Sequence, residues 1–176
     1  MNTLPLFKRD VLVSIRPIYA SKILSGDKTV ELRRKFPEAA IGATALIYAT
    51  SPVQAIVGYA RIKDILRLPI ARIWREHGAA ACIEQPDFDA YFDGMEFGFA
   101  VLLEGVQVLE RPVNARVLRD EFGVVPPQSF RYLDEGYAAL LSNEQVQISD
   151  RHQHRHRTGG RSARFGFACR TGQAQQ

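Results

Sequence analysis

The chain has 176 residues, 46% of them hydrophobic, which is enough for one domain with a substantial hydrophobic core and too few for two comfortable ones. Its net charge of +4 resides in residues 142–176, where six arginines face two acidic residues, while residues 1–141 are neutral, which excludes a uniformly basic domain. Two cysteines exclude a disulfide scaffold, and no apolar run approaches the roughly 18 residues that span a bilayer.

The first predicted elements are a strand, a helix and a second strand. Residues 11–15 are apolar and β-branched, as in a short strand. Pro17 suits the first turn of a helix, where its missing N–H group costs nothing, and Gly26 suits the left-handed turn that ends a helix. Residues 29–33 return to an alternating pattern, which predicts the second strand.

Two longer apolar segments follow and predict strands. Residues 43–50 form a mostly apolar run, and residues 55–66 predict a long strand in which Gly58 permits a bulge or a sharp bend. Helices are then expected to begin at Pro69 and at Pro86, because each proline precedes apolar residues at helical spacing.

The next segment predicts one more strand and further short helices. Residues 97–109 are expected to form a strand, and Asn114 to cap a short helix that ends near Gly123. Residues 126–130 predict a rigid turn, and residues 133–141 another helix. Strands outnumber helices, so we expect an α+β fold: a mixed, mostly antiparallel curved sheet or open β-barrel with short peripheral helices.

The last part of the chain differs in composition. Residues 142–176 contain only four large aliphatic or phenylalanine side chains among many arginines, glutamines, glycines and histidines. Such a segment buries too little apolar area to offset the entropy lost on ordering. We therefore expect one domain over residues 1–141 and a basic, disordered tail over residues 142–176.

The charged residues that are most informative lie around the second strand. Lys28 precedes it, and Glu31 and Arg33 lie two residues apart on one of its faces. Residues 1–35 carry eight basic and three acidic side chains, so a local positive patch can meet phosphate. Spacing alone favours a simpler interpretation, in which these residues form an ordinary ion pair on the protein surface.

A resemblance to a known family changes this balance. The pattern Gly26-x-Lys28-x-x-Glu31-x-Arg33, following Ser14-Ile-Arg-Pro17, resembles the signature of ASCH domains. Residues 47–58, Trp74, residues 91–94 and residues 127–133 resemble further segments of one branch of that family, in the same order. The resemblance implies a small PUA-like β-barrel, relatives that bind RNA, and a ligand cleft beside the motif.

We expect RNA or a nucleotide-like ligand to bind in that cleft. The candidate ligand-binding residues are Ser14, Arg16, Lys28, Glu31, Arg33, Tyr48, Thr50, Gln128 and Ser129. Tyr48 can stack on a base, although a tyrosine in such a strand is as often part of the core. Gln128 and Ser129 can bond a base edge or simply fix a turn, and Arg16 can face the cleft or water.

Catalysis is an open alternative. Lys28 could stabilise a pentavalent phosphate and Glu31 could accept a proton from a ribose 2′-hydroxyl, as in a ribonuclease. One ASCH branch removes acyl groups from N4-acylated cytidine with a lysine, a threonine nucleophile and a glutamate. Lys28 matches its lysine, but Glu31 stands where that threonine should be, which argues against this amidohydrolase chemistry. A regulator that senses a nucleotide is a third possibility.

The remaining expectations concern cofactors and location. Cys82 and Cys169 lack the spacing of zinc ligands, and no glycine-rich phosphate-binding motif is present, so neither a metal nor a cofactor is expected. Residues 1–10 contain no long apolar segment of the kind found in secretory signals. Together these features predict a cytoplasmic protein with no membrane partner.

Overall fold

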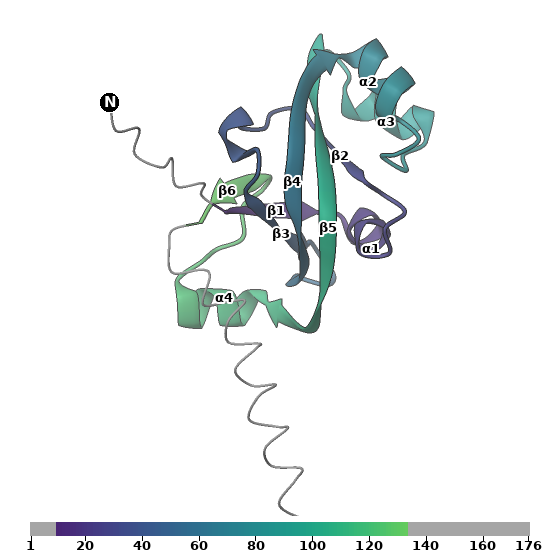
Figure 1. Cartoon of the computed structure of the whole chain (residues 1–176). Coiled ribbons are helices and arrows are strands. Elements are labelled where there is room, and N and C mark those ends of the chain that lie inside the picture. The colour runs from purple at the N-terminus through teal and green to yellow at the C-terminus, as the bar shows by residue number, and fades with distance from the viewer. Residues whose placement is uncertain (1–9, 134–176) are drawn as a thin grey trace, which may run out of the picture.

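A computed structural model describes residues 10–133 of the chain. Within them, six strands form one sheet in the order β2-β5-β4-β3-β1-β6 (Figure 1). The strands are β1 (Val11–Ile15), β2 (Val30–Arg33), β3 (Thr44–Ala49), β4 (Ala55–Pro69), β5 (Phe97–Asn114) and β6 (Phe130–Tyr132). The helices are α1 (Pro17–Leu24), α2 (Ile70–His77), α3 (Gln85–Tyr91) and α4 (Ala115–Phe122), with a 3-10 turn at Glu38–Ala40.

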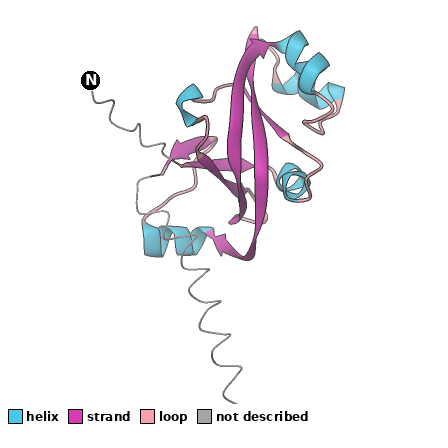
Figure 2. Cartoon of the chain, viewed as in Figure 1, coloured by secondary structure: helices cyan, strands magenta, loops and turns pink. Residues whose placement is uncertain are grey.

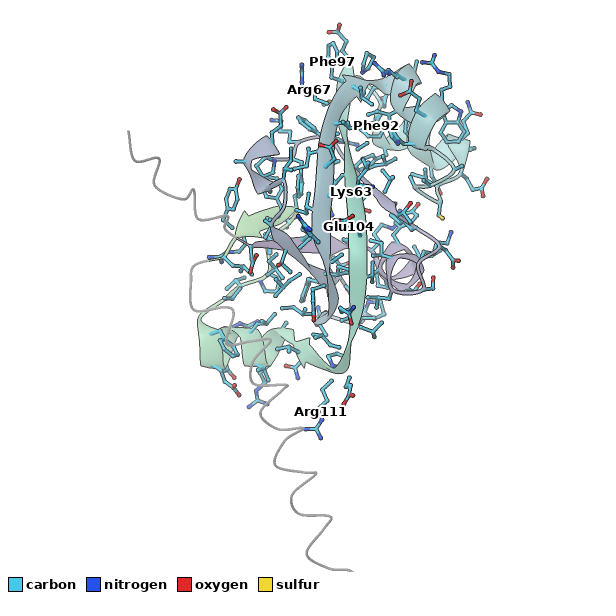
Figure 3. All side chains as sticks on the ribbon, viewed as in Figure 1. Lys63, Arg67, Phe92, Phe97, Glu104 and Arg111 are labelled. Carbon is cyan, nitrogen blue, oxygen red and sulfur yellow. The ribbon has the colours of Figure 1, made fainter. Side chains whose placement is uncertain are left out.

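The sheet is mixed and strongly curled, as the sequence predicts. Only β1 and β3 pair in parallel, and the other four pairings are antiparallel. The long strands β4 and β5 form a ribbon that runs through the molecule, with α2 and α3 at one end and α4 at the other (Figures 1 and 2). At the α2 end, the guanidinium of Arg67 lies 4.3 Å from the ring centroid of Phe97 (Figure 3).

Alternation along the strands divides the core between the two faces of the sheet. In β1, Val11 and Val13 join a cluster that also contains Ile23 of α1, whereas Leu12 joins a second cluster beneath α4. A third cluster packs Val30 and Leu32 of β2 against α2 and α3. Because the apolar residues of β2 face this third cluster, its alternate side chains, Glu31 and Arg33, must face the other way.

Gly58 lies at the irregular position that the sequence suggests. The β4–β5 register shifts between Ile56 and Gly58. A Cβ atom on Gly58 would lie 2.5 Å from the carbonyl oxygen of Gln107 in β5 and 2.5 Å from Cδ2 of Leu24 in α1. The absence of a side chain therefore lets β4, β5 and α1 approach one another, as barrels require at sharp bends.

The cap of α4 is also confirmed. The side-chain oxygen of Asn114 accepts a 3.0 Å hydrogen bond from the N–H of Val117, and Gly123 ends the helix in the left-handed conformation, with φ 64°. Two expectations were less accurate. The strand predicted over residues 97–109 continues to Asn114, and residues 130–132 form strand β6 on the edge of β1 rather than only a turn.

Some expectations fall outside the described part of the chain. The helix predicted over residues 133–141 has only its first residue described, and residues 142–176 lie wholly beyond it. Among residues 10–133, no helix is both long enough and apolar enough to cross a membrane.

Candidate ligand pocket at the mouth of the half-barrel

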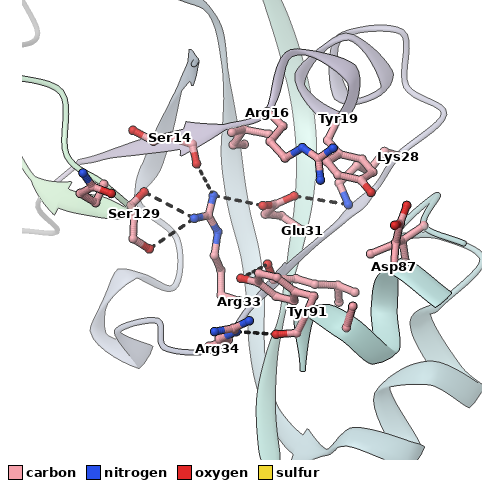
Figure 4. Close-up of a pocket in the computed structure, with 15 residues that line it drawn as sticks. Ser14, Arg16, Tyr19, Lys28, Glu31, Arg33, Arg34, Asp87, Tyr91 and Ser129 are labelled. Atoms are coloured by element: carbon pink, nitrogen blue, oxygen red, sulfur yellow. Dashed lines mark hydrogen bonds and ion pairs between the residues drawn. The ribbon is translucent and has the colours of Figure 1, made fainter. Parts of the chain in front are cut away.

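A pocket of about 570 Å³ opens where the two ends of the curled sheet approach each other. β2 forms one side, the end of β1 and the segment before β6 form another, and α1 and α3 complete it (Figure 4). Its polar and aromatic lining residues are Ser14, Arg16, Tyr19, Lys28, Glu31, Arg33, Arg34, Asp87, Tyr91, Gln128 and Ser129. Four of these side chains are basic and two are acidic.

The backbone around Lys28 is fixed on both sides. The N–H of Lys28 donates to the carbonyl of Lys22 at the end of α1, and the N–H of Thr29 donates to the carbonyl of Ala80. The Lys28 ammonium donates a 2.7 Å hydrogen bond to the carbonyl of Ala81 and lies 3.3 Å from Glu31 Oε2. Lys28 is only 3% exposed, and this burial lowers its pKa, which the neighbouring Glu31 carboxylate partly opposes.

Glu31 and Arg33 continue this chain of charges. Oε1 of Glu31 lies 3.1 Å from Nη2 of Arg33, which also donates a 2.8 Å hydrogen bond to the carbonyl of Ser14. Nη1 of Arg33 lies 3.3 Å from Oγ of Ser129, whereas Nε is buried without a hydrogen-bond partner. Lys28, Glu31 and Arg33 are all buried, so the ordinary surface ion pair that spacing alone favours is wrong.

Ser14 and Ser129 attach the segment before β6 to β1. The Ser14 hydroxyl donates a 2.6 Å hydrogen bond to the carbonyl of Pro127, and the Ser14 N–H donates to the carbonyl of Ser129 at 2.8 Å. Gln128 stands between Pro127 and Ser129 in the sequence, and its exposed side chain lines the pocket. The structure therefore brings together seven of the nine candidate residues: Ser14, Arg16, Lys28, Glu31, Arg33, Gln128 and Ser129.

Tyr48 and Thr50 are the two candidates that do not line the pocket. Tyr48 is 6% exposed and packs with Leu12 and Leu46 on the face of the sheet covered by α4. Burial raises the pKa of its hydroxyl, and the nearby Arg119 guanidinium opposes that rise. The backbone N–H of Thr50 donates to the carbonyl of Ile15, beyond the end of β3. The core interpretation of Tyr48 is the one that this position supports.

Four further polar or aromatic residues line the pocket, and sequence reasoning did not select them. Tyr19 lies 5.5 Å from the guanidinium of Arg16 and 5.2 Å from the ammonium of Lys28. The guanidinium of Arg34 lies 4.9 Å above the ring of Tyr91, whose carbonyl oxygen accepts a hydrogen bond from Arg34 Nε.

Burial raises the pKa of both tyrosines. The fourth residue is Asp87, on α3. One usable signal was the spacing of Tyr19, which lies three residues after Arg16, the residue that precedes α1. Asp87 and Tyr91 reach the pocket only because α3 packs beside β2, which no local pattern in the sequence indicates.

The comparisons with known proteins agree with this geometry. The family model of the ASCH domain matches residues 13–110, which is more than half of the chain. The chain belongs to the ASCH domain family. Among curated proteins it is 35% identical, over 127 residues, to the "ASCH domain-containing ribonuclease" of Zymomonas mobilis, covering 72% of this chain and 85% of that protein.

Solved structures confirm the PUA-like fold. The ASCH crystal structure from Zymomonas mobilis superposes with a TM-score of 0.71 at 32% identity, covering 80% of this chain and 96% of that one. The N-terminal domain of Staphylothermus marinus McrB superposes with a TM-score of 0.50 at 15% identity, covering 81% and 98%, which shows a likeness of fold alone. The expected α+β fold, a mixed and mostly antiparallel half-barrel with short peripheral helices, is thus confirmed for this ASCH domain.

Proposed function

We propose that this ASCH domain binds single-stranded RNA in the pocket between β2, β1, α1 and α3. The observation that carries the proposal is the excess of positive charge around a preformed hollow. Lys28 and Arg33 are held in its floor by fixed backbone carbonyls, and Arg16 and Arg34 are exposed at its rim. Cations at a concave site attract a phosphate backbone, and because two of these four are already oriented, binding orders fewer side chains.

The same pocket offers surfaces for a nucleobase. The stacked pair of Arg34 and Tyr91 presents a planar face, and unpaired bases stack on aromatic rings or guanidinium planes. Gln128 and Ser129 supply polar groups on the opposite side. Membership of the ASCH family and the relative named a ribonuclease support RNA as the ligand class.

Exposed rim residues provide the cleanest test of RNA binding. Replacing both Arg16 and Arg34 by alanine removes two positive charges from the rim without cutting the buried ion chain, so affinity for a short single-stranded RNA should fall by about tenfold or more at low salt. The matched control replaces Arg61 and Arg116, which are exposed, equal in charge and absent from the pocket lining. Equal loss in both double variants would show that the binding is generic attraction.

Ribonuclease activity is a second candidate, favoured by the name of the Zymomonas mobilis relative and by the Lys28–Glu31 pair. In such a reaction, Glu31 takes the proton of a ribose 2′-hydroxyl as that oxygen attacks the phosphorus atom. Lys28 and Arg33 stabilise the added negative charge, and the bond to the 5′-oxygen breaks. The products are a 2′,3′-cyclic phosphate and a 5′-hydroxyl end, with the leaving oxygen protonated by Lys28 or by water.

Glu31→Gln tests this candidate. The amide keeps the size of the side chain but cannot accept the proton, so cleavage of RNA should be lost while RNA binding stays measurable. The unfolding transition of the variant must be compared with that of the wild type, because Glu31 also forms ion pairs with both Lys28 and Arg33 and its loss can destabilise the fold. Cleavage at the wild-type rate by folded Glu31→Gln would exclude Glu31 as the base.

A further inference from the structure

We infer that Asp87 makes the pocket selective for guanine, by accepting two hydrogen bonds from the Watson–Crick edge of a bound base. This inference rests on the proposed RNA-binding function and names the base that the pocket prefers. Three features of the pocket carry it: the unpaired state of Asp87, its position relative to the cations, and the hydrogen-bonding pattern of its carboxylate.

Asp87 differs from the other carboxylate of the pocket. Both oxygens of Glu31 are already engaged, one by Lys28 and one by Arg33. Asp87 is exposed at the pocket wall, and its carboxylate makes no hydrogen bond or ion pair with any residue in the range 10–133. A carboxylate accepts hydrogen bonds and cannot donate them when ionised, so Asp87 offers two free acceptors to a ligand.

The position of Asp87 separates two kinds of binding surface. Figure 4 shows it projecting from α3, on the side of the pocket away from Ser129, with Tyr91 on the same helix. The carboxylate of Asp87 repels a phosphate group, whereas Arg33, beside Ser129 on the opposite side of the pocket, attracts it. A nucleotide therefore fits best with its phosphate toward Arg33 and the hydrogen-bond donors of its base toward Asp87.

The pairing chemistry then distinguishes the four bases. Guanine presents an N1–H group and an N2 amino group side by side, which matches the two adjacent acceptors of a carboxylate. Adenine and cytosine each place an acceptor nitrogen beside their amino group, and uracil flanks its single N–H with carbonyls. Those acceptors would face the negative charge of Asp87 and repel it. The stacked Arg34 and Tyr91 supply a surface for the large purine ring.

The simpler alternative is that Asp87 only stabilises the first turn of α3, where an acidic residue is favourable. That role would give Asp87 no influence on which RNA binds. Asp89 lies on the same helix, is exposed and does not line the pocket, so it provides a control of the same residue type.

The experiment measures the affinity of the full chain for four oligouridine RNAs that differ only in one central base. The wild type should bind the guanosine RNA about fivefold or more tighter than the others, and inosine, which lacks the 2-amino group, should lose part of that preference. Asp87→Asn should abolish the preference, so that the guanosine RNA binds no tighter than the plain uridine RNA. Asp89→Asn should keep the preference.

The outcomes that would overturn the inference are distinct from failure of the proposed function. Equal binding of all four RNAs by the wild type, or a guanosine preference that survives in Asp87→Asn, would refute the role of Asp87 and leave RNA binding in place. If the wild type binds none of the four RNAs, the proposed function and this inference are refuted together.

Discussion

The guanidinium of Arg33, in the strand at one edge of the sheet, donates a 2.8 Å hydrogen bond to the carbonyl of Ser14 in β1. Three strands, β5, β4 and β3, separate these two residues in the order of the sheet. The contact therefore crosses the opening of the half-barrel and ties its two sides together (Figure 4). The residues that line the pocket and the residues that close the fold are in part the same ones.

Arg33→Ala should lower the free energy of unfolding markedly. Removing the guanidinium leaves the carbonyl of Ser14 without this donor and Glu31 with only Lys28 as a partner, and breaking a buried pair costs about 3 kcal/mol or more. Denaturant unfolding of the full chain measures the change. The neighbouring Arg34→Ala, an exposed position, should change stability by less than about 1 kcal/mol. Equal destabilisation by the two substitutions would contradict the role of Arg33 in closure.

The lowered pKa of Lys28 predicts a pH dependence of stability. Between the pKa of Lys28 in the folded protein and its usual value of 10.5, the unfolded chain holds a proton that the folded chain has released. The free energy of unfolding therefore rises with pH through that window, and this contribution is absent at lower pH. In the variant Lys28→Met, this rise in the free energy of unfolding should disappear.

The measurement is the difference in unfolding free energy between wild type and Lys28→Met, from neutral pH to 10.5. The free energy of unfolding of the wild type, minus that of Lys28→Met, should increase as the pH rises. Tyr19 and Tyr91 have raised pKa values, so the unfolded chain ionises first above pH 10.0 and stability falls there, but it does so in both proteins. Parallel pH profiles would show that Lys28 is not desolvated.

Gly58→Ala should destabilise the fold by about 1–3 kcal/mol, because the added methyl group meets the backbone of Gln107 and cannot be accommodated by a rotamer change. Thermal or denaturant unfolding tests this expectation. Gly105→Asn is the comparison, since its position has φ 60° and open space around the missing Cβ, and asparagine tolerates that backbone. If Gly58→Ala were as stable as Gly105→Asn, the close approach of β4 and β5 would not exist in solution.

Much of this fold was predictable because its elements are locally encoded. The alternation in β1 and β2, the proline at the start of α1, and the Asn114 cap with Gly123 at the two ends of α4 all mark structure through neighbours in sequence. Strand β6 was missed, since three residues following two prolines carry almost no periodic signal and pair with β1 only in the folded sheet.

The site was predictable only where the chain itself places residues together. Lys28, Glu31 and Arg33 share one strand and its approach, so their proximity followed from spacing, although their burial did not. Asp87 and Tyr91 enter the pocket from a helix more than 50 residues away, and no local pattern indicates that α3 packs beside β2. Strand periodicity alone does not say which face of the sheet borders the pocket, and the side chain of Tyr48 in β3 lies on the face that α4 covers.

Salt dependence should report the rim contacts one by one. Each phosphate contact to single-stranded RNA contributes about −0.7 to the slope of log affinity against log salt concentration. Arg16→Ala and Arg34→Ala should each make the slope shallower by about that amount, and both together by about twice as much. Arg61→Ala should leave the slope of the wild type unchanged. A slope unaffected by the rim substitutions would mean that RNA does not contact Arg16 or Arg34.

The central claim is that RNA binds in the pocket rather than through the excess charge of residues 142–176. The most direct measurement is the RNA affinity of the full chain in which the six arginines of that segment are replaced by glutamine. We predict that binding falls by less than about tenfold, and that adding Arg16→Ala and Arg34→Ala then removes most of what remains. Loss of all measurable binding on neutralising residues 142–176 alone would contradict the account.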